Sequence, residues 1–221
     1  MKLFLSALTK FILGLILCAL LIFLPAGTLF YPGGLIFLAL LFIPILIFGA
    51  VLFFFAPDLL QKRLDSKEEE ADQKKVTAII GLMFLFGFVV AGLDFRFSWS
   101  SVPLFLRIAA SVIFLLSYGL YVEVMRENAY LSRNIKVHEG QKVVSTGLYG
   151  LVRHPMYFST VFLFLMIPLI LGSFYSFLLF LLYPFLIAFR IRNEEEVLSR
   201  SLPGYEEYKK KVKYRLIPFI Y

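Results

Sequence analysis

Uncharged runs long enough to cross a lipid bilayer occupy most of this 221-residue sequence. A helix needs about 20 apolar residues to cross roughly 30 Å of hydrocarbon, and in lipid its backbone groups must be satisfied within the helix. Four predominantly apolar runs are clear: Leu3 to Pro25, Leu35 to Ala56, Val76 to Leu93 and Val102 to Val122, of which the first and last each contain one charged residue, Lys10 and Arg107. Composition agrees, because 60% of the residues are hydrophobic, whereas soluble domains are about half apolar. The sequence therefore predicts an all-α, polytopic membrane protein.

A fifth uncharged stretch, from Met156 to Phe189, is too long for one crossing. As a single helix it would extend about 50 Å, well beyond the hydrocarbon thickness. We expect it to fold back at Gly172-Ser173 and to kink at Pro168 and Pro184. The prediction is thus about six spans, of which the last two form a helical hairpin.

Lysine and arginine are distributed unevenly around these spans. Of the 22 such residues, only Arg96 and Arg107 are assigned to the side of the membrane opposite the others. Because positive charge is retained in cytoplasmic loops, both termini are predicted to be cytoplasmic, with Arg107 extending toward the outer face. The charged segment 58–75 is interpreted as a solvated helix extension without chemistry.

No internal repeat or linker divides the chain, so we expect a single membrane domain over residues 1–221. Residues 1–123 would hold the four hydrophobic spans, and residues 124–221 the hairpin, a cofactor-binding region and a cytoplasmic tail.

Several other classes of protein are excluded or disfavoured. Cys18 is the one cysteine, which excludes an intrachain disulfide, and with His138 and His154 it makes too few ligands for a zinc site, so no metal is expected. The net charge of +7 is attributed to cytoplasmic loops, and no nucleic-acid partner is expected.

Polar residues gather first between Gln141 and Tyr157, just before the hairpin. Gly147 and Gly150 permit close backbone approach or positive φ, and Pro155 suits the first turn of the next helix. Arg153 and His154 would then lie beside the free amides of a helix N-terminus, which is a site for a carboxylate or phosphate. The alternative is that both residues only anchor the helix at the lipid headgroups.

Two further polar clusters follow the hairpin. The first contains Arg190 and the glutamates Glu194, Glu195 and Glu196; a hairpin returns the chain to the side it left, so this cluster should lie level with Arg153. The second is the tail 202–221, predicted to be a short basic, aromatic helix that ends at Pro218. The alternatives are a solvated helix end for the glutamates and an interfacial helix, attracted to anionic lipid, for the tail.

Taken together, these clusters carry a family resemblance. Between Gln141 and Pro218 the chain contains Gly-Leu-Tyr-Gly-Leu-Val-Arg-His-Pro-Met-Tyr, an uncharged hairpin, Glu-Glu-Glu-Val-Leu, Tyr-Glu-Glu-Tyr and Val-Lys-Tyr-Arg-Leu-Ile-Pro. This combination resembles the C-terminal half of the isoprenylcysteine carboxyl methyltransferase and phospholipid N-methyltransferase superfamily. The resemblance implies an integral-membrane methyltransferase that binds S-adenosyl-L-methionine at the cytoplasmic face and receives a lipophilic substrate from the bilayer.

The resemblance also implies a set of site residues. Arg153, His154 and the amides near Pro155 would meet the carboxylate of the cofactor, and Glu194 and Glu195 its ammonium or ribose. The remaining expected contacts are aromatic faces for adenine or sulfonium and backbone for the adenine edge, supplied by Tyr149, Tyr157, Tyr205, Val143 and Gly147. Arg153 and Glu195 are expected to be the catalytic pair. No strand and glycine-rich loop of a Rossmann-type site is present, so helix ends and the tail must build the site.

The acceptor is left open by the sequence. A carboxylate, as in an isoprenylcysteine-like molecule, is already ionised and needs no base, whereas the amine of a phospholipid must first lose a proton. The closing Tyr-Arg-Leu-Ile-Pro-Phe-Ile-Tyr is also similar to the end of NADPH-dependent membrane sterol reductases, which are much longer. A non-catalytic scaffold with a lipid-binding tail is the remaining alternative, and the oligomeric state is not predicted.

Overall fold

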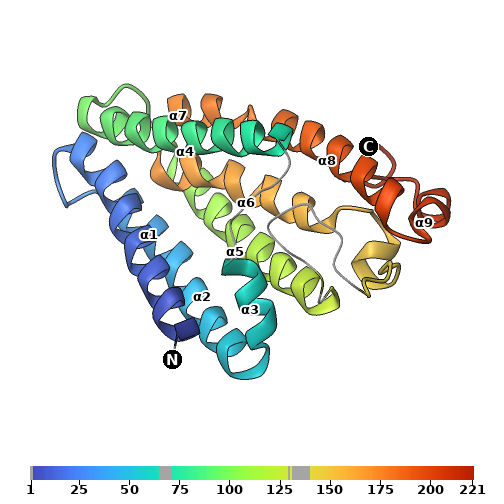
Figure 1. The fold of residues 1–221 in the computed structure, drawn as a ribbon. Helices are drawn as coiled ribbons and strands as arrows, with labels where there is room; N and C mark the ends of the chain where they lie inside the picture. Colours follow the sequence, from blue (N-terminus) through green and yellow to red (C-terminus); the bar gives the residue numbers. More distant parts are fainter. Residues whose placement is uncertain (1, 65–70, 129, 131–139) are drawn as a thin grey trace.

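The computed structural model describes residues 2–64, 71–128, 130 and 140–221, and within them the chain is helical and has no strand (Figure 1). The helices are α1 (Lys2–Ala26), α2 (Pro32–Phe55), α3 (Pro57–Leu64), α4 (Ala71–Phe97), α5 (Leu104–Glu127), the 3-10 turn η1 (Gly147–Gly150), α6 (Pro155–Leu171), α7 (Phe174–Phe180), α8 (Tyr183–Ser201) and α9 (Tyr205–Lys211). Five stretches are long and apolar enough to cross a membrane, namely α1, α2, α4, α5 and the run through α7 and α8. The shorter α6 is a sixth apolar helix. The predicted fold class is confirmed.

The predicted hairpin turns at Gly172. This residue follows α6 with φ +89°, a left-handed conformation that favours glycine, and its amide donates to Pro168 O at 2.9 Å. Ser173 then caps α7, because its hydroxyl accepts from the Ser176 amide at 3.0 Å. The second arm breaks between α7 and α8, next to Pro184. Helix α8 continues well past Phe189, so the acidic triplet is helical.

The short connections between helices meet at one end of the molecule. The Tyr31 hydroxyl, in the α1–α2 connection, donates to Leu171 O at 2.6 Å, and the Phe174 amide donates to the Ser100 hydroxyl at 3.0 Å. Asp94 is buried near the end of α4 and accepts hydrogen bonds from Ser100 and Ser173. These contacts fix the α6–α7 turn against both other connections, which lie toward the left of Figure 1.

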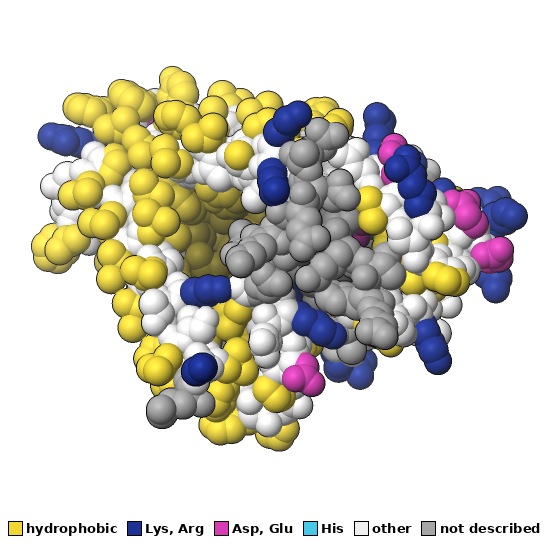
Figure 2. Space-filling model, viewed as in Figure 1, with side chains coloured by type: hydrophobic (Ala, Val, Ile, Leu, Met, Phe, Trp, Pro, Cys, Tyr) yellow, Lys and Arg dark blue, Asp and Glu magenta, His cyan; other side chains and the backbone are white. Residues whose placement is uncertain are grey.

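Aromatic rings pack between the membrane helices next to this end of the molecule. The rings of Phe84 and Phe180 lie 5.1 Å apart and join α4 to α7, while Phe37 of α2 contacts Phe88 and Phe114 at 5.6 and 6.3 Å. Many other large hydrophobic side chains face outward, as Figure 2 shows. Such a surface suits contact with lipid, and the chain is an integral membrane protein.

Two sequence predictions need correction. Segment 58–75 was interpreted as solvated, yet Gln73 is buried and donates from Nε2 to Arg190 O at 3.5 Å, because this part of α4 packs against α8. Residues 65–70 lie outside the described residues. The tail helix was predicted to end at Pro218, but α9 ends at Lys211, since the chain after it is extended against the residues that precede α6.

Candidate functional site

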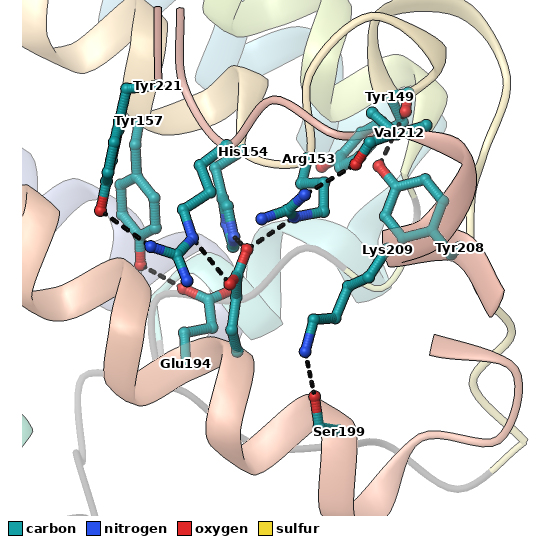
Figure 3. A network of polar contacts seen from close by, with 12 residues as sticks. Tyr149, Arg153, His154, Tyr157, Glu194, Ser199, Tyr208, Lys209, Val212 and Tyr221 are labelled. Carbon is teal, nitrogen blue, oxygen red and sulfur yellow. Dashed lines mark hydrogen bonds and ion pairs between the residues drawn. The ribbon is translucent and has the colours of Figure 1, made fainter. Parts of the chain in front are cut away.

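Glu195 is the centre of a polar network at the other end of the molecule. Figure 3 shows this network, with Arg153 and His154 labelled among its members. Glu195 Oε1 accepts from Arg153 Nε at 2.7 Å and lies 3.2 Å from His154 Nε2, and Glu195 Oε2 accepts from Arg215 Nε at 2.9 Å. The three partners come from the loop before α6 and from the tail. One buried carboxylate therefore joins three segments that are distant in the sequence.

Arg153 also holds the tail through its backbone and side chain. Its Nη1 donates to the carbonyls of Val212 and Lys213 at 2.7 and 2.8 Å. The Arg153 amide donates to Tyr214 O and the His154 amide to Arg215 O, both at 2.9 Å. Tail residues 212–215 thus bind along the start of α6, and they occupy two of the amides that the sequence suggested for an anion.

Glu194 takes part in a second network on a different side of α8. Successive residues of an α-helix point about 100° apart, so Glu194 meets α6 where Glu195 meets the loop and the tail. The Tyr157 hydroxyl donates to Glu194 Oε2 at 2.6 Å and accepts from Arg190 Nε at 3.0 Å. Arg190 Nη1 donates to the Thr77 hydroxyl of α4 at 3.2 Å. Tyr157 therefore connects the acidic triplet to the space between α4, α6 and α8.

The turn around η1 is locked to the end of α5. Gly147 has φ +54°, and a Cβ there would collide with the Glu127 carboxylate, which accepts from the Leu148 amide at 3.0 and 3.2 Å. The Tyr149 hydroxyl accepts from Asn128 Nδ2 at 3.0 Å, and Tyr149 O accepts from the Tyr208 hydroxyl at 2.7 Å. Burial raises the pKa of Tyr149 to about 12. The turn is thus bound to α5 through Glu127 and to α9 through Tyr208.

Tyr205 of α9 is a buried tyrosine. Its side chain packs with Leu202, Tyr208 and Val212, and Val143 covers the same cluster. The residue is only 4% exposed, and its hydroxyl finds no hydrogen-bond partner among the residues that the structure describes. Burial, reinforced by the charges of Glu195 and Glu194, raises the pKa of this phenol. A buried hydroxyl is normally satisfied, so this one marks a position that can meet a ligand.

A cavity of about 470 Å³ lies next to this network. Its polar end contains Thr77, Tyr157 and Arg190, which are joined by hydrogen bonds. Arg63 is a further lining residue, and much of the remaining wall is apolar. The other lining residues come from α4, α5, α6 and α8: Ile80, Gly81, Phe84, Tyr121, Met156, Thr160, Phe164, Tyr183 and Ile187. The face seen in Figure 2 is hollowed to the left of its centre, with hydrophobic side chains along the left and upper sides of the hollow. Tyr157 and Arg190 belong to both the cavity and the polar network.

The structure brings most predicted site residues together. Arg153, His154, Tyr157, Glu194 and Glu195 are joined by direct contacts. Tyr149, Tyr205 and Val143 lie in the layer formed with the tail, whereas Gly147 and Pro155 shape a turn and a helix start. The roles assigned to these residues remain predictions.

Sequence reasoning missed several members of this region. Arg215 lies within the quoted tail motif, but nothing in the motif showed that it would bind Glu195. Arg63, Thr77 and the cavity itself had no signal, because they depend on how α3 and α4 lie beside α6 and α8.

Comparison with known proteins identifies the central part of the chain. No curated protein matches the sequence. The model of the phospholipid methyltransferase family matches residues 105–203, which run from the start of α5 through α8 and include Arg153 and Glu195. Over residues 105–203 the chain is therefore similar to the phospholipid methyltransferase family, in agreement with the superfamily resemblance predicted from the sequence.

Proposed function

We propose that this protein transfers a methyl group from S-adenosylmethionine to a lipophilic acceptor at the cytoplasmic face of a membrane. The observation that carries the proposal is the buried hydroxyl of Tyr205, which has no hydrogen-bond partner among the described residues and lies within the electrostatic influence of Glu195 and Glu194. A buried phenol near the buried Glu195 and the partly exposed Glu194 fits a cofactor that carries an ammonium, a ribose diol and a cationic sulfur. When bound, the cofactor supplies an electrophilic methyl group on that sulfur.

We assign the residues around this position two kinds of role. Glu194 and Tyr205 would bind the cofactor directly, with Val143 and the rings of Tyr149 and Tyr157 forming the walls. Arg153, His154 and Glu195 satisfy one another, and they would act by holding α8, the loop before α6 and the tail in register. Positioning is a sufficient task for such residues, since well-oriented reactants can gain about 7–11 kcal/mol.

The cavity beside Tyr157 would receive the acceptor. Arg63 and Arg190 line it, and no aspartate or glutamate is among its described lining residues. Two guanidinium groups favour an anionic head group over an ammonium. A carboxylate acceptor, as in an isoprenylcysteine-like molecule, has an ordinary pKa of about 3.5 and needs no protein base. The chain would then orient the carboxylate and exclude water from it.

The phospholipid amine remains the second candidate acceptor, since the family description names phospholipids. An amine must lose a proton before it attacks, and the described cavity lining offers no carboxylate or histidine to accept it. A sterol-type reductase and a lipid-binding scaffold are the remaining alternatives.

Orientation in the membrane is part of the proposal. All lysines and arginines other than Arg96 and Arg107 fall in segments 2–10, 58–75, 126–153 and 190–215, and positive charge is enriched in cytoplasmic segments. We therefore place both termini and the Glu195 network in the cytoplasm.

Labelling of membrane lipids tests this function. Membranes containing the protein are incubated with donor carrying a radiolabelled methyl group, and the extracted lipids are treated with mild alkali. We expect labelled lipid whose label is released as methanol, as for a methyl ester. Alkali-stable label would favour an N-methylated amine. No labelled lipid, with NADPH consumed instead, would support the reductase and overturn the proposal.

A further inference from the structure

One face of α4 lines the cavity. The lining residues Thr77, Ile80, Gly81 and Phe84 follow the spacing i, i+3, i+4 and i+7, which places them on a single helix face. Gly81 is the one position of this stripe that carries no side chain. It is also exposed, so the stripe is open at that point and Gly81 lies at the rim of the cavity.

Packing along α4 shows that this opening is local. At Gly87 a Cβ would collide with the Phe180 ring, which presses against the helix there. At Gly81 an added Cβ meets no atom of the described residues within 4 Å. The glycine at 87 is thus required for contact with α7, whereas no neighbour requires the glycine at 81. After Phe84, helix α4 packs tightly against α7 at Gly87. Before Phe84, there is free space beside the helix at Gly81.

The opening lies close to the polar end of the cavity. Gly81 follows Thr77 by one helical turn, a rise of about 6 Å, and Thr77 accepts a hydrogen bond from Arg190. The nearby wall is apolar, with Ile80 before Gly81 and Phe84 after it on α4, and Phe164 on α6. An amphiphile with its head at Arg190 would therefore pass its chain along these side chains and out past Gly81.

We propose that Gly81 is a specificity-determining position, at which the missing side chain leaves a lateral opening for the hydrocarbon chain of the methyl acceptor. This inference rests on the proposed function for the identity of its ligand. It means that one residue, which contacts neither Glu195 nor the tail, limits how bulky the hydrocarbon chain of the acceptor can be. A larger side chain at position 81 would narrow the opening and leave the polar network intact.

A thiol placed at the rim tests occupancy without any assay of methyl transfer. Replacing Cys18, the one native cysteine, with serine gives a background in which Gly81→Cys carries a single thiol. Gly119→Cys is the matched control, because Gly119 is also exposed on a membrane helix, has open space around its Cβ and does not line the cavity. Both variants are labelled with a membrane-soluble maleimide after thermal unfolding confirms that they fold.

The probe is the farnesyl thioether of N-acetylcysteine, a prenyl chain with a carboxylate head. We expect it to slow labelling of Gly81→Cys at least about tenfold and to leave Gly119→Cys unchanged, the size of effect that close contact in an apolar site gives. Equal protection at the two positions, or protection at neither, would overturn the inference.

Activity provides a second measurement. Gly81→Leu should raise the KM for the farnesyl acceptor about tenfold or more, with a smaller effect on a geranyl acceptor, while Gly119→Leu matches the wild type. An unchanged KM in Gly81→Leu would contradict the inference. If the wild type transfers no methyl group, the proposed function fails, and the labelling result still decides whether an amphiphile passes Gly81.

Discussion

Arg153 and Glu195, separated by 42 positions in the sequence, form an ion pair at 2.7 Å in which the side chains are only 7% and 4% exposed. The pair closes the polar end of the α6–α8 hairpin and holds the tail against it. Removing one member of a buried pair is strongly destabilising, because the partner is left as an uncompensated buried charge. Each residue is therefore expected to act through the position of the segments that it joins.

Loss of the Arg153 guanidinium should release the tail. Arg153→Ala is expected to lower the free energy of unfolding by about 3–5 kcal/mol and to increase hydrogen exchange in residues 212–216, measured by mass spectrometry in detergent. The control is Arg200→Ala, which removes an exposed pair with Glu196 and should change stability by less than about 1 kcal/mol. Unaltered exchange in the tail of Arg153→Ala would show that the pair does not hold it.

Two neighbouring tyrosines should respond in opposite ways to loss of the hydroxyl. The Tyr208 hydroxyl donates to buried Tyr149 O, so Tyr208→Phe is expected to destabilise the protein by about 1–3 kcal/mol. Tyr205→Phe removes a hydroxyl that has no partner within the described chain and should leave stability unchanged or raised. It should instead weaken binding of S-adenosylhomocysteine several-fold. Thermal unfolding and calorimetric titration of both variants check this, and a stability loss confined to Tyr205→Phe would refute it.

Alkaline pH should undock the turn around Tyr149. An ordinary tyrosine has a pKa of about 10, and burial raises that of Tyr149 to about 12. Because the raised pKa belongs to the folded state, the neutral phenol contributes stability fully below about pH 10. That contribution is lost as the pH rises through the folded value. We expect phenolate absorbance and near-ultraviolet circular dichroism to show a late transition that Tyr149→Phe reduces. Identical titration curves for wild type and variant would contradict this assignment.

Much of the architecture follows from local patterns in the sequence. Uncharged runs predicted the spans, and Gly172 with Ser173 marked the turn of the hairpin, because a glycine with positive φ and a serine cap are local requirements. The meeting of Arg153 with Glu195 followed from the same turn, since a hairpin returns the chain to its starting level.

Other features depend on contacts that sequence patterns do not contain. The tail was predicted as a helix up to Pro218, but Arg153 supplies hydrogen-bond donors that favour extended chain from Val212 onward. The Glu127 carboxylate at Gly147 and the partnership of Arg215 with Glu195 arise from tertiary packing. The open space at Gly81 depends on how α4 lies against α6 and α8, which no single helix encodes.

Calorimetric titration of the purified protein with S-adenosylhomocysteine tests the central claim most directly, with Glu194→Gln and the matched variant Glu196→Gln beside the wild type. Glu194 contacts Tyr157, whereas Glu196, two positions further along α8, is exposed. The proposed site predicts binding to the wild type and to Glu196→Gln with similar affinity, and binding at least about tenfold weaker to Glu194→Gln, as expected for loss of a charge-assisted hydrogen bond. Absence of binding to the wild type, or equal affinity for the two variants, would contradict the account.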